Sequence, residues 1–472
     1  MKDESQSLGV LVLAAGKGTR MNSSKPKVLE TLLEEPVIYY PVEAAKAAGF
    51  SNIAVLVGHR GDRVEEYVKK EWPDVDVVWQ REQLGTGHAV KVAGDWWMQF
   101  DNIMVVNGDV PLVLPQTIAG LYEKHVRMRL QCTFMSFMLE DPSGYGRVAR
   151  LADGGVRIIE DKDAVDEERM IHEINAGVYV FSRDALAEVI NHLGRGNEQN
   201  EYYLTDTIPL IGDTEGLVDV VLCDDPNELL GINTPMDLAA TADALHRRIL
   251  LRHMTNGLKC MDPATTWIGP RVEIEQDVFL EPGVQIWGNT RIAAGVRIGA
   301  HTTLRDVSVG EGTVILGPSV LSDAEIGRGA EIGPFAFLRG GVEMKDSSKV
   351  GRFVEIKKSV IGEGTKVPHL SYIGDTNIGA GTNIGAGTIT CNYDGSAKHR
   401  TTIGEGCFVG SDTMFVAPVA MGDNASTAAG SVVTKDIPDG ALGIARARQT
   451  NIDKWHDRKS VENQHKKDSR ES

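Results

Sequence analysis

The sequence has few cysteines, and none of them form a C-x-x-C pair. The five are spread over 472 residues, at Cys132, Cys223, Cys260, Cys391 and Cys407. Thiols with this spacing indicate a reducing compartment rather than a disulfide framework. We therefore expect a cytoplasmic protein.

Positive charge is also scarce. The chain has 49 lysines and arginines against 66 aspartates and glutamates, which gives a formal net charge of −17. A chain this acidic is repelled by polyanions, so we expect neither nucleic acid nor an anionic membrane as a partner. A local basic pocket is still allowed.

No apolar run near the start is long enough to cross a membrane. The first, residues 8–15, follows an acidic and polar start and leads into a glycine-rich loop rather than a cleavage site. The chain is too long for one compact core, so we expect two domains.

The glycine-rich loop is the first motif with chemical content. Residues 8–15 (LGVLVLAA) have the composition of a buried parallel strand, and Gly16 and Gly18 follow. Such glycines let bare backbone N–H groups approach a ligand, and three cations stand close by at Lys17, Arg20 and Lys27. This favours polyphosphate binding, although a plain glycine turn with solvated basic side chains is the alternative. Neither the Rossmann nor the P-loop motif is matched.

This stretch resembles the signature of sugar-phosphate nucleotidyltransferases, L-A-A-G-x-G-T-R-M followed by P-K-x-L. The resemblance implies that a sugar 1-phosphate attacks the α-phosphate of a nucleoside triphosphate and that pyrophosphate leaves. Lys17 and Arg20 would then hold the pyrophosphate, and Lys27 would stabilise charge on the transferred group. Because such transfer depends mostly on positioning and electrostatics, Arg20 and Lys27 are the expected catalytic residues.

Up to about residue 230, short apolar runs alternate with longer amphipathic stretches. Residues 53–58 and 103–106 are typical of buried strands, and residues 37–48 and 63–70 are typical of helices. This alternation predicts a Rossmann-like α/β domain with a mostly parallel sheet, whose ligands bind beyond the carboxyl ends of the strands.

Residues 80–89 (QREQLGTGHA) place a hydroxyl between glycines, which suits a nucleobase edge; a hairpin or helix-capping loop is the alternative. The segment resembles the base-recognition segment of the same family. The resemblance implies a uracil contact for three of its residues, while His88 is expected to be structural. The full UTP site would comprise Leu13, Ala14, Gly16, Lys17, Gly18, Lys27, Gln80, Gly85 and Thr86.

Asp109 follows the strand predicted over residues 103–106. Its carboxylate is a ready ligand for Mg²⁺, which proteins hold with few carboxylates plus substrate phosphates; an ordinary Asx turn is the alternative. The segment resembles the family pattern G-D-x-P-L, with Asp109 as the metal aspartate and Asn107 in place of an expected aromatic residue. By the same resemblance Asp109 and Asn233 hold Mg²⁺, and the N-terminal sugar site comprises Asp109, Gly146, Glu160, Asn175 and Asn233.

A helix start follows at once. Thr234 can cap, Pro235 suits the first helical position, and Gly257 is a suitable stop. We expect a helical arm over residues 234–257 between a nucleotidyltransferase domain at 1–233 and a second domain at 258–450.

From about residue 262 the apolar period becomes six. The series comprises Val272, Val278, Val284, Ile292, Ile298, Leu304, Val320, Ile326, Ile332, Ile378, Ile384, Ile403, Val409, Phe415 and Met421. One inward aliphatic residue per six predicts a left-handed parallel β-helix with three hexads per coil and about nine or ten coils. Its flat faces favour self-association.

The period breaks at residues 338–341, 366–372 and 391–398. His369, at the second break, could accept a proton from an amino sugar that attacks a thioester, and Arg339 and Lys357 could hold a sugar phosphate. Packed or surface roles are the alternative for each.

The segments at 354–358, 369–375 and 383–395 resemble the acetyltransferase half of the bacterial bifunctional N-acetylglucosamine-1-phosphate uridylyltransferase/glucosamine-1-phosphate acetyltransferases. With the first half, the resemblance covers nearly all of residues 8–450. It implies His369 as the catalytic base and a homotrimer whose subunits share this site. The amino-sugar site would comprise Arg339, Lys357, Tyr372, Asn383 and Asn392. The acetyl-CoA site would comprise Ala386, Tyr393, Lys398, Ser411, Ala429 and Arg446.

The resemblance implies an enzyme of UDP-N-acetylglucosamine synthesis for cell-wall and lipopolysaccharide precursors. Its small-molecule substrates would be UTP, N-acetylglucosamine 1-phosphate, glucosamine 1-phosphate and acetyl-CoA. Two alternatives stay open: a purely structural β-helix, and an N-terminal site for another sugar or base. The tail at 451–472 has charges of both signs and few apolar residues, so we expect disorder there.

Overall fold

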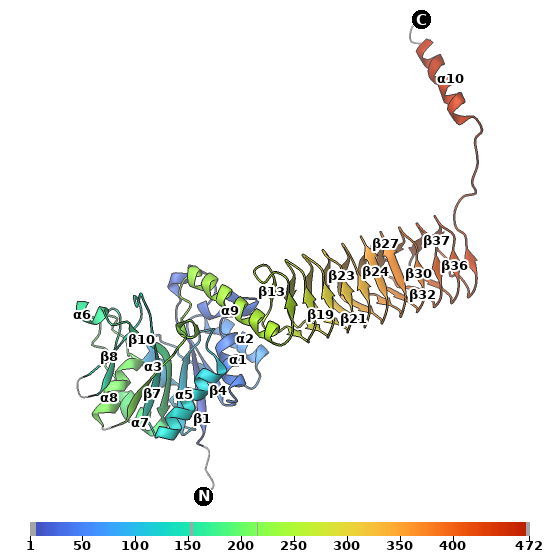
Figure 1. Ribbon diagram of the computed structural model, residues 1–472. Helices are drawn as coiled ribbons and strands as arrows, with labels where there is room; N and C mark the ends of the chain where they lie inside the picture. The colour runs from blue at the N-terminus through green and yellow to red at the C-terminus, as the bar shows by residue number, and fades with distance from the viewer. Residues whose placement is uncertain (1–5, 152–153, 215, 469–472) are drawn as a thin grey trace. The chain divides into compact units, whose positions relative to one another are not determined.

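The computed structural model describes residues 6–151, 154–214 and 216–468 and divides into two compact units, Met1–Ile249 and Leu250–Ser472 (Figure 1). All five cysteines are free, as expected for a chain without a disulfide framework. Within the described ranges, no helix combines the length and apolar character that a membrane crossing requires.

The first unit is built on a mixed, mostly parallel sheet in the order β11-β7-β10-β6-β1-β4-β5. Its centre is β1 (Leu8–Ala14), which pairs in parallel with β4 (Ile53–Val57) and β6 (Asn102–Asn107). These are the three strands that the apolar runs predict. The other strands are β5 (Asp76–Trp79), β7 (Cys132–Met138), β8 (Arg147–Arg150), β9 (Val156–Ile159), β10 (Glu173–Ser182) and β11 (Val218–Leu222).

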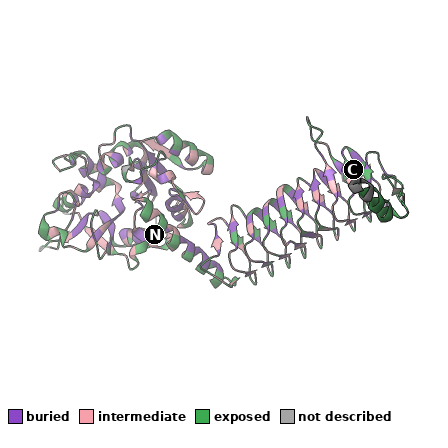
Figure 2. Cartoon of the chain, turned by 90° about the horizontal axis from the view of Figure 1, so that it is seen from above, coloured by how far each residue is buried: buried purple, intermediate pink, exposed green. Residues whose placement is uncertain are grey.

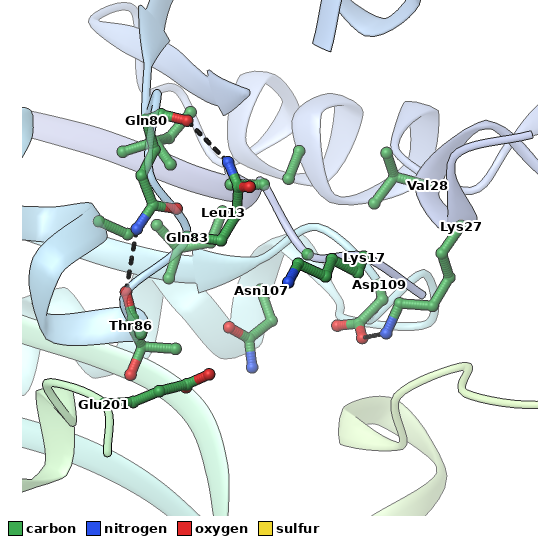
Figure 3. Close-up of a pocket in the computed structure, with 16 residues that line it drawn as sticks. Leu13, Lys17, Lys27, Val28, Gln80, Gln83, Thr86, Asn107, Asp109 and Glu201 are labelled. Atoms are coloured by element: carbon green, nitrogen blue, oxygen red, sulfur yellow. Dashed lines mark hydrogen bonds and ion pairs between the residues drawn. The ribbon is translucent and has the colours of Figure 1, made fainter. Parts of the chain in front are cut away.

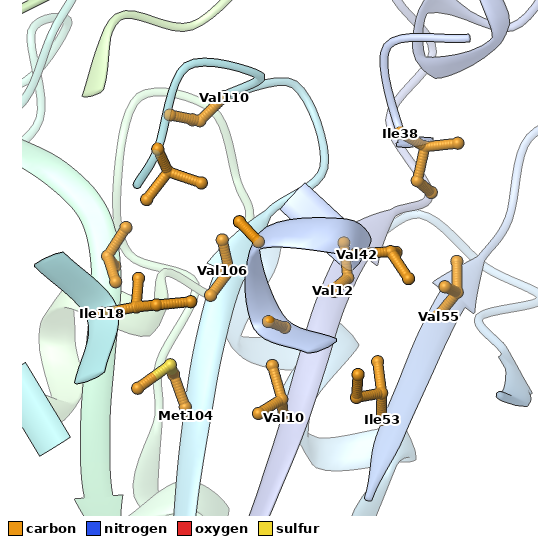
Figure 4. Close-up of a cluster of buried hydrophobic side chains, with 14 of the residues drawn as sticks. Val10, Val12, Ile38, Val42, Ile53, Val55, Met104, Val106, Val110 and Ile118 are labelled. Carbon is orange, nitrogen blue, oxygen red and sulfur yellow. The ribbon is translucent and has the colours of Figure 1, made fainter. Parts of the chain in front are cut away.

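Helices cover both faces of this sheet because its central strands are buried on both sides. Val10 and Val12 point to the face covered by α1 (Tyr39–Ala47), α2 (Gly61–Glu71) and α5 (Pro115–Met128) (Figure 4). Leu11 points to the opposite face, which α3 (Thr86–Val92), α7 (Arg183–Val189) and α8 (Thr207–Asp213) cover. The helices expected over residues 37–48 and 63–70 are therefore confirmed as α1 and α2.

Helix α9 (Pro235–Thr255) forms where the sequence predicts a helical arm. Thr234 Oγ1 accepts a hydrogen bond from the backbone N–H of Asp237 at 3.2 Å, so the expected cap is present. Gly257 follows the helix with a φ of +101°, a left-handed conformation that suits glycine and ends the helix.

The second unit is a parallel β-helix with three faces. An 11-stranded ladder, from β12 (Lys259–Cys260) to β38 (Leu442–Gly443), forms one face, and a 16-stranded sheet forms the other two. The long strands β19 (Thr303–Val309), β21 (Val320–Ile326) and β23 (Phe337–Met344) belong to both of those faces. Glu273 pairs with Arg291 on the next coil and Phe279 pairs with Arg297, a spacing that confirms three hexads per coil.

The hexad residues form the thin core of this unit, and buried and exposed positions alternate along its strands (Figure 2). Val320 is the exception: its side chain is 44% exposed, whereas that of Leu321 is fully buried. The inward residues Leu321 and Ile326 are five positions apart rather than six, so a period of six counted back from Ile326 ends on Val320 instead of Leu321. The prediction of Val320 as a core residue is wrong by one position.

The break at 391–398 is an insertion that leaves the stack intact. Lys366 pairs with Asn383, and Asn383 pairs with Phe408 on the next coil, so the coil that contains the break is much longer than the one before it. The extra residues form a small loop closed by a bridge between Tyr393 and Lys398. Asp394 holds the loop together, because its carboxylate accepts the backbone N–H groups of Ser396 and Ala397 and contacts His399.

The tail contains a helix where we expect disorder. Helix α10 spans Trp455–Asp468, and its residues from 455 to 463 are exposed. This stretch has few apolar residues that could pack against a core, which is why we expect disorder. Its lysine, glutamate, glutamine and arginine residues are nevertheless good helix formers. The structure thus contains a helix with exposed residues in this segment, and disorder of the tail in solution stays a prediction.

Candidate active sites

A cavity of about 400 Å³ lies beyond the carboxyl ends of β1 and β6, where a parallel sheet places its ligands. Gln80, Gln83 and Thr86 lie toward one end of the cavity, and Lys17, Lys27 and Asp109 lie toward the other (Figure 3). Nine residues expected from the sequence line it: Leu13, Ala14, Gly16, Lys17, Lys27, Gln80, Gly85, Thr86 and Asp109.

The two glycines of the first loop have different structural roles. Gly16 lines the cavity, and a Cβ added there would meet no atom within 4 Å. Gly18 has a φ of +57°, and a Cβ there would lie 2.7 Å from Lys27 Cβ. Gly16 therefore leaves room for a ligand beside the backbone, whereas Gly18 leaves room for Lys27.

A network of glutamines shapes the opposite end of the cavity. Gln80 is buried, and its Nε2 lies 3.1 Å from the backbone oxygen of Gly85 and 3.1 Å from His88 Nδ1. Gln83 Nε2 donates to the backbone oxygen of Gln80 at 2.9 Å. His88 also stacks on Tyr202, which gives it the structural role that we expect.

Gly85 and Thr86 join this end to a distant segment of the chain. Gly85 has a φ of +106°, and a Cβ there would lie 2.4 Å from the backbone oxygen of Tyr202. Thr86 Oγ1 accepts the N–H of Leu204 at 3.0 Å. Helix α3 begins at Thr86, so the first residue of this helix also lines the cavity.

Lys27, Asp109 and Asn233 meet beside the cavity. The Lys27 ammonium forms an ion pair with Asp109 and lies 3.2 Å from Asn233 Oδ1. Arg20 Nη2 donates to the same amide oxygen at 2.9 Å. One carboxylate oxygen and one amide oxygen thus converge on a cation.

This donor set fits Mg²⁺, which needs only a few protein oxygens when substrate phosphates supply the rest. Among the described residues, no group of three or more histidines, cysteines, aspartates or glutamates could hold a metal on its own. Asp109 and Asn233 are residues that could hold such an ion together with phosphate oxygens.

Gly146, Glu160 and Asn175 form a second cluster and are not among the residues that line the cavity. A Cβ at Gly146 would lie 3.6 Å from Glu160 Oε2 and 3.7 Å from Asn175 Cβ. Asn175 donates to Tyr179 Oη at 2.6 Å, and Glu160 accepts from Thr205 at 3.0 Å. Burial, together with the nearby carboxylates of Asp206, Asp163 and Asp161, raises the pKa of Glu160.

Sequence reasoning missed Glu201, whose side chain lines the cavity near Thr86. Asn197 holds the backbone of this residue from both sides: its Oδ1 accepts the Glu201 N–H at 3.0 Å and its Nδ2 donates to the Glu201 oxygen at 2.6 Å. Gln83 and Ala15 line the cavity as well. Gln83 and Ala15 lie inside the motifs that we quote, whereas nothing near Glu201 signals a ligand.

In the second unit, His369 heads a column of residues on one corner of the β-helix. Lys366, Asn383, Phe408 and Ser426 pair along one ladder, so the residues three positions later also stack. Those residues are His369, Ala386, Ser411 and Ala429. His369 is exposed, and its backbone oxygen accepts the Ser371 hydroxyl at 2.7 Å.

A polar cluster lies on the adjoining face. Lys357 pairs with Gly374 on the next coil, and a Cβ at Gly374 would lie 2.5 Å from Tyr372 Oη and 2.7 Å from Asn392 Nδ2. Asn392 Nδ2 donates to the Asp375 carboxylate. The neighbouring Lys357 ammonium lowers the pKa of Lys398.

The other predicted residues of this unit lie around these two groups. Arg339 pairs with Lys357 along the ladder, and its guanidinium binds the Glu355 carboxylate, with Nε at 3.0 Å. Asn383 is on the ladder that carries the His369 column, three residues before Ala386. Tyr393 is exposed on the inserted loop, and Arg446 follows the last strand, β38.

Comparison with known proteins relates both units to known transferases. Residues 10–138 match the model of the MobA-like NTP transferase domain, and residues 271–306 match that of the bacterial transferase hexapeptide with six repeats. A bifunctional protein GlmU from Carboxydothermus hydrogenoformans is 43% identical over 442 residues, which is 93% of this chain and 98% of that protein. Those of Geotalea uraniireducens and Streptomyces coelicolor are 43% and 42% identical and cover 98% and 94% of their own lengths, each over 95% of this chain.

These relatives span both units, and their coverage is nearly complete on both sides. Their bifunctional description agrees with two separate groups of candidate residues, one in the α/β unit and one on the β-helix. The chain belongs to the GlmU family of bifunctional transferases, which act as uridylyltransferase and acetyltransferase.

Proposed function

We propose that the two activities act in sequence on one sugar. The β-helix unit transfers the acetyl group of acetyl-CoA to glucosamine 1-phosphate. The α/β unit then joins N-acetylglucosamine 1-phosphate to UTP and releases pyrophosphate. In this proposal residues 1–233 carry uridylyl transfer, residues 234–257 connect the domains, and residues 258–450 carry acetyl transfer.

The cavity of the first unit supports the uridylyl step. Gln80, Gly85 and Thr86 would bind uracil at one end, while Lys17 and Arg20 would hold the leaving pyrophosphate. A phosphate oxygen of the sugar 1-phosphate attacks the α-phosphorus of UTP, and the bond from that phosphorus to the pyrophosphate oxygen breaks. Lys27 would neutralise charge on the transferred phosphoryl group, in line with the electrostatic character of such reactions.

We propose that the divalent metal used by this chain is Mg²⁺. Asp109 and Asn233 would hold it, and it would supply positive charge to the phosphate groups when bound. Gly146, Glu160 and Asn175 would bind the sugar hydroxyls and the acetamido group. Their close approach to one another supports a shared ligand.

The corner column of the β-helix supports the acetyl step. The neutral amine of glucosamine 1-phosphate attacks the thioester carbonyl, the carbon–sulfur bond breaks, and CoA leaves as the thiol. His369 would accept the proton that the amine loses. Arg339, Lys357, Tyr372, Asn383 and Asn392 would bind the amino sugar, and Ala386, Tyr393, Lys398, Ser411, Ala429 and Arg446 would bind acetyl-CoA.

Assembly into a homotrimer in the cytoplasm completes the proposal. Phe335, Phe353 and Leu370 follow one another on a corner of successive coils next to His369, and all three are exposed. The rings of Phe335 and Phe353 stack with centroids 5.1 Å apart. An exposed apolar ridge of this kind favours contact with a further subunit.

The decisive experiment measures thiol release from acetyl-CoA with glucosamine 1-phosphate as acceptor and without UTP. We expect release that depends on the amino sugar. A protein that releases no thiol, yet makes pyrophosphate from UTP and N-acetylglucosamine 1-phosphate, would leave the β-helix with a purely structural role.

A further inference from the structure

The amide ligand proposed for the metal, Asn233, lies just before helix α9, and an acidic residue of the first helical turn holds it there. Asp237 Oδ2 accepts the backbone N–H of Asn233 at 2.9 Å and that of Thr234 at 2.8 Å. Thr234 Oγ1 in turn accepts the N–H of Asp237 at 3.2 Å. This reciprocal arrangement fixes the backbone of residues 233 and 234 through charge-assisted hydrogen bonds.

The side chain of Asn233 is held mainly through its amide oxygen, which accepts hydrogen bonds from Arg20 and Lys27. Its Nδ2 reaches only the backbone oxygen of Gly231, at 3.5 Å, which is the limit of a hydrogen bond. Its Oδ1 faces Arg20 and Lys27, the cations beside the cavity. The backbone of Asn233, which Asp237 holds, sets the position from which this oxygen reaches the two cations.

The same helix also holds the segment that carries the other proposed metal ligand. Arg248 Nη1 donates to the backbone oxygen of Leu112 at 2.6 Å, three residues beyond Asp109. The backbone oxygen of Asp109 accepts the N–H of Ile232 at 2.9 Å, in the segment that leads into α9. The backbone segments that carry these two side chains are thus tied to α9 or to the residues that lead into it.

We infer that Asp237 is a positioning residue for the divalent metal of the uridylyl site, and that it acts by orienting Asn233. The inference rests on the proposed function, in which Asn233 and Asp109 hold Mg²⁺. Residues that orient metal ligands in this way commonly change metal affinity about 10- to 100-fold when they are removed. A side chain that only capped α9 would change the stability of the helix and leave the metal affinity unchanged.

The test compares metal binding by full-length Asp237→Ala and by the wild-type enzyme. Mn²⁺ serves as the probe for Mg²⁺, and its binding in the presence of UTP is followed by electron paramagnetic resonance. We expect the Mn²⁺ dissociation constant, and with it the Mg²⁺ concentration for half-maximal uridylyl transfer, to rise about 10- to 100-fold. Amide hydrogen exchange in the strands of the α/β unit, measured on the same samples, reports that this unit is folded.

Two further variants separate positioning from capping. Asp237→Asn keeps an oxygen that can accept both N–H groups, so we expect it to recover most of the metal affinity. Asp243→Ala, an exposed position on the same helix, is the matched control and should bind Mn²⁺ as the wild type does.

Asn233→Ala distinguishes failure of the inference from failure of the proposed function. If Asn233→Ala weakens Mn²⁺ binding and Asp237→Ala does not, Asp237 is only a helix cap and the inference is overturned. If Asn233→Ala binds Mn²⁺ normally, Asn233 is not a ligand, and both the ligand set and the inference fall. Should Asp237→Ala not fold, Asp237→Ser takes its place, because its shorter side chain cannot reach both N–H groups. Wild-type Mn²⁺ affinity in Asp237→Ser would then overturn the inference.

Discussion

The ammonium of Lys27 is ion-paired with the carboxylate of Asp109, which lies 82 residues further along the chain. The same ammonium lies 3.2 Å from Asn233 Oδ1, so one cation bridges the two oxygens proposed as metal ligands. A metal ion held by these oxygens would compete with Lys27 for them. Lys27 would then be available to the reacting phosphate and would share the neutralisation of the substrates' negative charge with the metal.

Replacing Asp109 tests this arrangement directly. We expect Asp109→Ala to lower kcat of uridylyl transfer by about 100-fold or more, because a carboxylate at the centre of the charge network is lost. Acetyl transfer should be unaffected. Pyrophosphate release and thiol release, measured separately, give the two rates. The matched control is Asp74→Ala, which removes a surface partner of Lys46.

If Asp109→Ala still released pyrophosphate at the wild-type rate in the presence of Mg²⁺, Asp109 would not belong to the site.

His369→Ala should have the opposite pattern. We expect thiol release to fall by about 100- to 10,000-fold, the range that general-base groups supply, and uridylyl transfer to continue. His301→Ala, at another exposed corner of the β-helix, should leave both rates unchanged. Equal loss of both activities in His369→Ala would contradict the assignment of two separate sites.

Substitution of Gly16 tests whether UTP lies close to the backbone of the glycine-rich loop. Gly16→Ala should fold normally, because the added methyl group meets no protein atom within 4 Å. That methyl group would occupy space beside the loop, so we expect KM for UTP to rise about 10-fold or more. Gly94→Ala, which also has open space around it, is the control. An unchanged KM in Gly16→Ala would show that the ligand does not lie against this loop.

The buried side chain of His125 should make the stability of the α/β unit depend on pH. Its side chain is 1% exposed, its Nδ1 lies 2.9 Å from Thr133 Oγ1, and its Nε2 lies 3.2 Å from Asn102 Oδ1. Burial lowers the pKa of His125 to about 4 from an ordinary value of 6.5. The unfolded chain therefore binds the proton more readily, and the free energy of unfolding should fall as pH drops from about 6.5 toward 4, by at most about 3 kcal/mol.

Amide hydrogen exchange in β6 and α5, compared at pH 7 and at pH 5 after correction for intrinsic exchange rates, measures this loss of stability. His125→Gln should be less stable at pH 7 but should lose much less stability on acidification. The exposed His192→Gln should behave as the wild type does. If His125→Gln keeps the full pH dependence, another group is responsible.

The exposed ridge on the β-helix predicts how assembly and acetyl transfer are linked. Phe353 is 56% exposed and has a φ of +57°, a conformation that aspartate tolerates better than phenylalanine. Phe353→Asp should therefore fold, sediment as a monomer, and lose acetyl transfer by at least about 10-fold. Uridylyl transfer should continue. Leu222→Asp, at an exposed position of the α/β unit, is the control, and a Phe353→Asp protein that still sediments as a trimer would place the interface elsewhere.

The sequence was most informative where a pattern repeats or where one short segment holds a whole feature. The strands around β1 and the hexad core follow from local hydrophobic periods, and most residues of the uridylyl cavity come from three contiguous motifs. Val320 shows the limit of a period: the inward residues Leu321 and Ile326 are five positions apart, and six-residue spacing cannot reveal the change.

The features of the site that could not be predicted depend on contacts between segments that are far apart in the sequence. Glu201 reaches the cavity because Asn197 holds its backbone and because Gly85 allows its segment to approach, and neither contact has a sequence signal. The insertion after Thr390 was visible as a break in the hexads, but the loop that it forms depends on hydrogen bonds to Asp394. In the same way, the convergence of Asn233 and Asp109 on Lys27 could be expected only from resemblance.

Successive coils of the β-helix differ in length, so whether a residue points inward or outward depends on its position counted from the preceding corner. Each coil must return the chain to the same corner. Extra residues are accommodated by the loop at 391–398 and by a register shift between Ser322 and Ala324, where β21 pairs with β23. A single deletion inside a strand would turn every later inward residue toward solvent until a corner restored the phase. A loop at a corner can therefore grow without disturbing the stack, as the loop at 391–398 does.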